Sequence, residues 1–295
     1  MPRHLQNYSA QALSALRRER EAQGHAIKLV FFDVDGTLVN SQKQIPESCA
    51  KEIQRIKAQG VRTAIASGRP LFACETLFQQ YGLDDAGVFC TGAVVYDPQQ
   101  KQTLAEHKLQ ENELNSLISL SRAAGLHLEL YSNEMYFIEH NTEYTDYHTS
   151  YLKVAPVLDS FDAVTGCNAL NKALIVAASK QEKQALQHIK QQLPTLRFYT
   201  GHGPDRPDIH FVSILANSAC KARAFTRLCD YHQLEPANVM AIGDAQSDLA
   251  FIQAAGTGVA MGNANQALQT EADFVSAHVD EDGLALALRS LVGEA

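Results

Sequence analysis

Long apolar runs are missing from this chain of 295 residues. No stretch approaches the about 18–20 consecutive apolar residues that a membrane-spanning helix needs. The N-terminus is polar and lacks the apolar centre of a secretory signal. We therefore expect a cytoplasmic protein with no membrane partner.

An excess of positive charge is missing as well. The chain has 25 Lys and Arg against 33 Asp and Glu, a formal net charge of −8. Because nucleic-acid backbones attract clustered Lys and Arg, we expect no nucleic-acid partner. Hydrophobic residues make up 45% and charged residues 20%, which is typical of a folded globular protein and excludes a disordered one.

Paired cysteine motifs are absent too. None of the six cysteines forms a C-x-x-C pair, and their spacing indicates no zinc site. Several stand in apolar runs, so reduced core cysteines are the simpler interpretation, in keeping with a reducing cytosol. Internal repeats and low-complexity segments are also lacking.

Apolar strands alternate with helices in the first third of the chain. We expect strands over 27–32, 61–66 and 87–90, with helices over 46–59 and 71–81 between them. Strands that alternate with helices are typical of a parallel sheet with crossover helices. The sequence therefore predicts an α/β fold with a Rossmann-like parallel sheet.

The middle of the chain has a different pattern. Short strands and helices over 93–207 are typical of an α+β arrangement, mostly antiparallel, and the parallel pattern returns afterwards. We therefore predict a core domain over 26–92 and 208–295 with a domain inserted over 93–207. Residues 1–25 are expected to form a helical extension, either a surface helix or a frayed tail, without a partner-binding role.

Two acidic pairs follow predicted strands. Asp33 and Asp35 come directly after the first strand, and Gly36 permits the chain to turn there. Asp244 and Asp248 follow a strand near the C-terminal end. Taken alone, the first pair could be an ordinary acidic turn and the second a helix cap.

Ligands of open parallel sheets bind beyond the carboxyl ends of the strands, so both pairs are expected at one edge. Their mutual repulsion is costly unless a cation neutralises it. Because the ligands are all oxygens, Mg²⁺ is the expected ion. Ser67, Gly68 and Lys221 stand near the same edge and suit a phosphate, although each alone is a weak signal.

The combination resembles the haloacid dehalogenase superfamily in its phosphatase branch, from about residue 27 to the end. D-x-D-G-T-L, a Ser at a strand end, a Lys that opens a helix and G-D-x-x-x-D occur in the family's order. Lys221 follows Ser67 by 154 residues, so the insertion is similar to the cap domain of the Cof-type subfamily. Asp35 favours a phosphatase or phosphomutase over a dehalogenase or a transport ATPase.

The resemblance implies a phosphatase for a small phosphorylated metabolite, such as a sugar phosphate or a cofactor phosphate, acting as a monomer or homodimer. Asp33 would be the nucleophile that forms an aspartyl-phosphate, and Asp35 the general acid and base. The implied Mg²⁺ ligands are Asp33, Asp35, Asp244 and Asp248, and the implied phosphate-binding residues are Gly36, Ser67, Gly68 and Lys221.

Two other interpretations stay open at this point. A phosphomutase would use the same groups, and a weakly catalytic binding module could keep the fold. Several positions also depart from the subfamily's usual residues, which leaves the substrate open. These positions are Thr91, Ser247 and Val279, together with Cys220 and Ala222 on either side of Lys221.

Overall fold

A computed structural model describes residues 2–167, 169–203 and 206–293. The chain divides into two compact units. The core unit comprises Met1–Gly68, Thr76–Gln102 and Lys221–Ala295, and the insert unit comprises Arg69–Glu75 and Thr103–Cys220. Among the described residues, no helix is long and apolar enough to cross a membrane.

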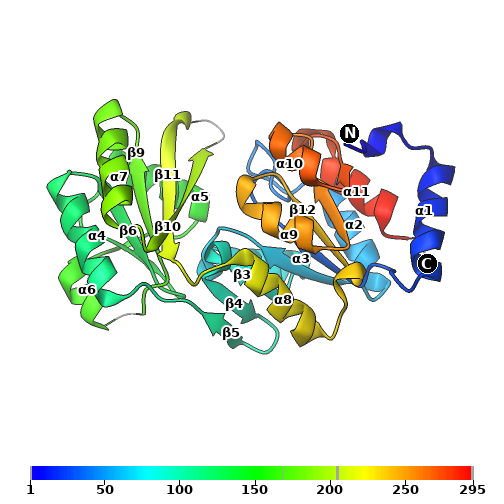
Figure 1. The fold of residues 1–295 in the computed structure, drawn as a ribbon, viewed down its shortest axis with the longest axis horizontal. Coiled ribbons are helices and arrows are strands. Elements are labelled where there is room, and N and C mark those ends of the chain that lie inside the picture. Colours follow the sequence, from blue (N-terminus) through cyan, green and yellow to red (C-terminus); the bar gives the residue numbers. More distant parts are fainter. Residues whose placement is uncertain (1, 168, 204–205, 294–295) are drawn as a thin grey trace. The chain divides into compact units, whose positions relative to one another are not determined.

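The core unit is built on an eight-stranded sheet whose edge strand, Gln102–Glu106, continues past the unit boundary after Gln102 (Figure 1). Its first six strands in spatial order run parallel, and the next pairs antiparallel with its neighbour. The strands, in that order, are β14 (Phe274–Val275), β13 (Thr257–Ala260), β12 (Val239–Gly243), β1 (Leu29–Phe32), β2 (Arg62–Ala66), β3 (Asp85–Phe89), β4 (Val94–Asp97) and β5 (Gln102–Glu106). Every residue of the central strand β1 is buried, as expected for a parallel strand covered on both faces. The predicted α/β class is confirmed.

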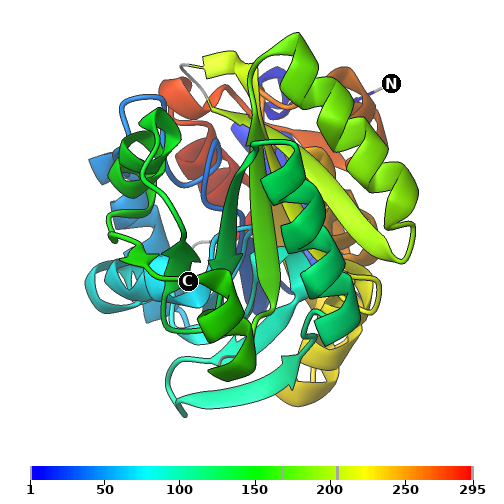
Figure 2. The ribbon, with the colours of Figure 1, turned by 90° about the vertical axis from the view of Figure 1, so that its left-hand side faces the viewer.

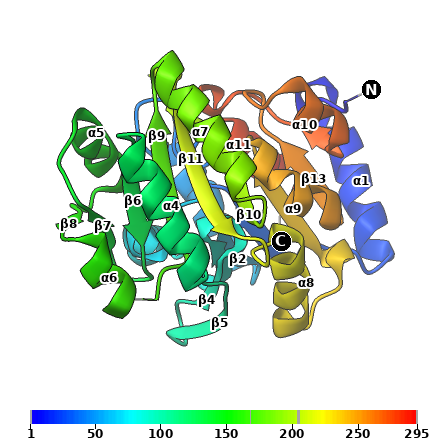
Figure 3. The ribbon, with the colours of Figure 1, turned by 60° about the vertical axis from the view of Figure 1, so that its left-hand side comes forward.

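Helices cover the core sheet in two groups. Helix α2 (Glu47–Ala58) packs on α11 (Gly283–Leu291). Helix α8 (Lys221–His232) lies beside α9 (Leu249–Ala254) (Figure 3). The connection β1–α2–β2 runs along the sheet in one direction and β12–α9–β13 in the other. Because such crossovers are right-handed as a rule, α2 and α9 lie on opposite faces of the sheet. The direction in which the chain adds strands to the sheet therefore reverses between β1 and β12.

Other helices complete the core unit and the segments that join it to the insert unit. The remaining α-helices are α1 (Ala10–Ala22), α3 (Glu75–Tyr81) and α10 (Gln266–Glu271). The 3₁₀ helices are η1 (Leu5–Asn7), η2 (Leu71–Cys74), η3 (Cys90–Gly92), η4 (Pro236–Asn238), η5 (Gln246–Asp248) and η6 (Val279–Glu281).

The insert unit is a six-stranded, mainly antiparallel sheet with helices on it. Its strands in spatial order are β10 (Leu196–Gly203), β11 (Arg206–Ala216), β9 (Lys172–Ala177), β6 (His127–Tyr131), β7 (Tyr136–Ile138) and β8 (Val157–Leu158). Helices α4 (Glu111–Ala123) and α7 (Lys180–Gln192) lie across one face of this sheet (Figure 2). Two further helices are α5 (Glu143–Leu152) and α6 (Phe161–Cys167).

Strand β6 of the insert unit carries a buried carboxylate. Leu128 and Leu130 belong to the apolar cluster under the helices, so Glu129 points to the other face by the two-residue period of a strand. Glu129 is fully buried, 3.0 Å from His127 Nε2 and 2.6 Å from His148 Nδ1. Burial alone would raise the pKa of Glu129, but the two histidines hold it well below its usual range.

The unit boundaries differ from the expected ones at residues 93 and 207. Strand β4 pairs with β3 of the core sheet, so the chain leaves the core unit only after Gln102. Strand β11 pairs with β9 of the insert sheet, which postpones the return to Lys221. In both places a hairpin extends one sheet, and the pattern of apolar residues alone does not show to which sheet a hairpin belongs.

The N-terminal extension is docked on the core unit. His4 forms a parallel bridge with Val275, and the Val275 N–H donates to the Arg3 carbonyl at 2.9 Å. These contacts cover the edge strand β14. Leu5 is 1% exposed, so the start of the chain is part of the core, not the frayed tail that the sequence left open.

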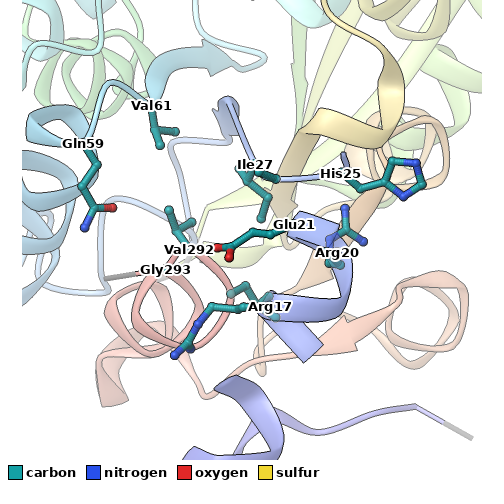
Figure 4. Close-up of a pocket in the computed structure, with 11 residues that line it drawn as sticks. Arg17, Arg20, Glu21, His25, Ile27, Gln59, Val61, Val292 and Gly293 are labelled. Carbon is teal, nitrogen blue, oxygen red and sulfur yellow. The ribbon is translucent and has the colours of Figure 1, made fainter. Parts of the chain in front are cut away.

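Two arginines of α1 bind backbone carbonyls of the core unit. Arg17 Nη1 donates to the carbonyls of Arg289 and Ser290 at the end of α11, and Arg20 donates to those of Ala237 and Gly256. A cavity of about 250 Å³ lies between α1 and the segment that follows α11 (Figure 4). The arginines near it are thus already engaged in holding the extension in place.

Shortening Leu5 tests whether the extension contributes to stability. We expect Leu5→Ala to lower the free energy of unfolding by about 2–4 kcal/mol, because it leaves a cavity at a buried site. Leu158→Ala is the matched control, since Leu158 is 58% exposed, and should change it by less than about 0.5 kcal/mol. Urea titration would measure both, and equal midpoints for the two variants would contradict a docked extension.

Candidate active site

The acidic residues gather at the ends of β1 and β12, the two neighbouring strands between which the strand order of the core sheet reverses. Asp33 follows β1 and Asp244 follows β12, and these two strands are parallel neighbours. Their carboxyl ends therefore lie side by side at the edge where open sheets bind ligands. Carboxylate oxygens of Asp33, Asp244 and Asp248 lie within 4.8 Å of one another.

A tight turn after β1 brings its residues against Asp244. The N–H of Val39 donates to the Val34 carbonyl at 2.8 Å, and Gly36 has a φ of +86°. A Cβ atom at Gly36 would lie 2.3 Å from Asp244 Oδ2, so a glycine is required there. Thr37 Oγ1 donates to Asp244 Oδ1 at 3.2 Å.

This turn changes the role expected of Gly36. Its N–H was a candidate donor to a phosphate, but it donates to the Val39 carbonyl at 3.1 Å and so closes the turn. What Gly36 contributes is the absence of a side chain, which lets Asp244 approach. The sequence indicated the turn but not which carbonyl would take this N–H.

Lys221 and Asp248 form a buried ion pair. Lys221 Nζ donates to Asp248 Oδ1 at 2.7 Å and to the Ala66 carbonyl at 3.0 Å, and both side chains are less than 5% exposed. The N–H groups of Asp244 and Ala245 donate to Asp248 Oδ2 at 3.2 and 3.0 Å. Both oxygens of Asp248 are therefore engaged, and this residue orients the loop that carries Asp244.

The local charges favour a bound cation. Burial raises the pKa of Asp33 well above its ordinary value, Asp248 raises it further, and Lys221 opposes them only in part. Burial and Asp248 likewise raise the pKa of Asp244 to about 8. These carboxylates are costly to ionise together. An all-oxygen set of this kind fits Mg²⁺.

The other predicted residues lie at the same edge of the core unit. Ser67 follows β2 directly and is buried. Its N–H donates to the Val88 carbonyl, and its own carbonyl accepts from the Thr91 N–H at 3.1 Å. Gly68 faces Thr91, since a Cβ there would lie 3.2 Å from Thr91 Oγ1. Asp35 is half-buried in the turn after β1.

Two residues with no role assigned from the sequence contact Asp244. Thr37 is one, and Asn263 is the other, with Nδ2 at 3.3 Å from Asp244 Oδ2. Thr37 stands inside the D-x-D-G-T-L motif that carries the family resemblance, and this motif was its only signal in the sequence. Asn263 follows β13, outside the four motifs, and no local pattern indicates that it contacts Asp244 in another loop.

Comparisons with known proteins agree with this geometry. Residues 30–288 match the family described as haloacid dehalogenase-like hydrolase. A 5-amino-6-(5-phospho-D-ribitylamino)uracil phosphatase of Bacillus subtilis is 28% identical, over 88% of this chain and 96% of its own. A pyridoxal phosphate phosphatase of Escherichia coli is 24% identical, over 88% of this chain and 96% of its own.

A solved structure has the same fold. A haloacid dehalogenase-like hydrolase from Bacteroides thetaiotaomicron superposes with a TM-score of 0.80 at 25% identity, over 89% of this chain and 98% of its own. The family match covers most of the chain and includes every predicted site residue. The expected resemblance is confirmed, the named relatives support a phosphoric monoester hydrolase, and the chain belongs to the haloacid dehalogenase-like hydrolases.

Proposed function

We propose that this protein is a Mg²⁺-dependent phosphatase that hydrolyses a small phosphorylated metabolite through an aspartyl-phosphate on Asp33. The observation that carries the proposal is the cluster of Asp33, Asp244 and Asp248 with Lys221 at the carboxyl ends of β1 and β12. The names of the two relatives support a sugar-phosphate or cofactor-phosphate substrate.

The carboxylates of Asp33 and Asp244 and the backbone carbonyl of Asp35 are the groups that would hold the ion. A bound Mg²⁺ would neutralise these carboxylates and the charge on the phosphoryl oxygens. Asp248 would support these ligands rather than bind the ion itself, because Lys221 and two backbone N–H groups already occupy its oxygens. Outer partners of this kind orient the ligands.

In the first half-reaction, a carboxylate oxygen of Asp33 attacks the phosphorus. The bond from phosphorus to the leaving oxygen breaks, and the carboxyl group of Asp35 gives its proton to that oxygen. The products are the dephosphorylated alcohol and an aspartyl-phosphate on Asp33. Asp35 suits this task because it is half-buried at a turn rather than enclosed.

In the second half-reaction, water attacks the phosphorus of the aspartyl-phosphate. Asp35, now ionised, takes a proton from this water, and the bond between phosphorus and Asp33 breaks. Phosphate leaves and both aspartates return to their first state. Lys221 adds a positive charge beside the phosphoryl oxygens, and Ser67 and Gly68 are the remaining groups proposed to bind them.

Phosphate release from a panel of sugar phosphates and cofactor phosphates tests this function. We expect release with Mg²⁺ and a loss of at least about 100-fold after chelation, because the clustered carboxylates then repel the substrate. Restoring Mg²⁺ should restore the rate. An isomerised sugar phosphate without free phosphate would indicate a phosphomutase, and no turnover in folded, Mg²⁺-supplied protein would contradict an enzymatic function.

A further inference from the structure

We propose that Asn263 is a positioning residue that holds the Asp244 carboxylate and the turn after β1 in the geometry needed to bind Mg²⁺. The inference rests on the proposed metal site. Asn263 follows β13, the neighbour of β12 in the core sheet. Its side chain therefore reaches Asp244 from the strand next to the one that carries Asp244.

Both the nitrogen and the oxygen of the Asn263 side-chain amide form hydrogen bonds within the protein. Nδ2 donates to the Gly36 carbonyl at 2.9 Å and to Asp244 Oδ2 at 3.3 Å. Oδ1 accepts from the Val279 N–H at 3.0 Å. An amide nitrogen has two N–H groups, so one side chain links the turn after β1, the loop after β12 and the segment after β14.

The Asp244 carboxylate is held from both sides. Thr37 donates to Oδ1 and Asn263 to Oδ2. By binding the Gly36 carbonyl, Asn263 also fixes the peptide next to the Asp35 carbonyl, a proposed ligand. Groups that orient metal ligands in this way commonly change metal affinity by about 10- to 100-fold when removed.

Both a side chain and backbone contacts support Asn263: Gln269 Nε2 donates to the carbonyls of Gly262 and Ala264 at 3.1 and 3.0 Å. The segment after β14 is tied to the loop of Asn263 by the Gly262 N–H, which donates to the Ala277 carbonyl at 2.9 Å. A Cβ at Gly262 would lie 2.6 Å from the His278 nitrogen, so only glycine permits this approach. Because Val279 contributes its N–H, the unusual side chain at that position leaves the contact intact.

Mg²⁺ binding without substrate tests the inference. Isothermal titration of Asn263→Ala with Mg²⁺ alone should give a Kd about 10- to 100-fold above that of the wild type. At saturating Mg²⁺ the KM should stay within about threefold while kcat falls, because the lost contact positions a ligand and does not touch substrate. Asn263→Leu, which keeps the volume, should give the same shift in Kd if Asn263→Ala folds poorly.

Asn265→Ala is the matched control. Asn265 lies two residues away and caps α10 by accepting from the Leu268 N–H at 2.9 Å. Its removal should lower the melting temperature by a few degrees and leave the Mg²⁺ Kd within about twofold. An unchanged Kd in both Asn263 variants would overturn the positioning role. Failure of the wild type to bind Mg²⁺ would instead overturn the proposed metal site, and the inference with it.

Discussion

Replacing Asp33 with asparagine is expected to lower kcat by at least about 10⁴-fold, while making the metal-free protein more stable. An amide is too weak a nucleophile to form the acyl phosphate, so turnover stops at the first step. Burial and the neighbouring carboxylates raise the pKa of Asp33, so its ionised form costs stability near pH 7. The free energy of unfolding should therefore rise by about 1 kcal/mol or more.

Opposite changes in activity and stability distinguish this prediction from simple misfolding. Phosphate release and urea unfolding without metal would measure the two effects. Asp230→Asn is the control, because it makes the same chemical change at an exposed position of the core unit. It should leave both quantities nearly unchanged. Detection of phosphate covalently attached to the Asp33→Asn protein during turnover would remove Asp33 from its proposed role.

Replacing Lys221 with methionine is expected to lower the free energy of unfolding by about 3–5 kcal/mol. Methionine is unbranched and only one atom shorter than lysine, but it leaves the Asp248 charge unpaired beside Asp33 and Asp244. An unpaired buried charge has a cost of this size. We expect phosphatase activity to fall by at least about 100-fold as well, because a positive charge at the phosphoryl group is lost.

Urea unfolding of metal-free protein would measure the stability effect. Lys51→Met is the matched control, since the Lys51–Glu47 ion pair is 73% and 83% exposed at its two side chains. Exposed pairs contribute little, so the control should lose less than about 1 kcal/mol. A loss in Lys221→Met no larger than in this control would mean that the Lys221–Asp248 pair does not support the site.

Much of the core unit follows from the sequence. The runs that form β1 and β12 are long enough for strands and apolar on both faces, which is the pattern of a buried parallel strand. The run that forms β2 is shorter in apolar residues, and it is buried after its first residue. Polar residues directly after such strands must meet at one edge, because the strands are parallel. This reasoning predicts from the sequence alone that Asp33, Ser67 and Asp244 lie at one edge of the sheet.

Other features could not be read from the sequence. A mid-strand Glu129 looks like a solvated residue until helix α5 places His148 beside it. The polar extension looks like a surface helix until Leu5 is found buried against the core. In each case the partner lies in another element, and local patterns carry no information on which elements meet.

The parallel core, the order of its chemical motifs and the edge at which they gather can all be predicted from local sequence patterns, because periodicity and strand ends are local properties. The tertiary structure decided which atoms pair there: Lys221 with Asp248, Thr37 and Asn263 with Asp244, and the Gly36 N–H with its own turn. The pairings of Lys221, Thr37 and Asn263 join residues that lie 19 to 207 positions apart in the sequence. They depend on the hand of the crossovers and on loop geometry, which only the folded chain specifies.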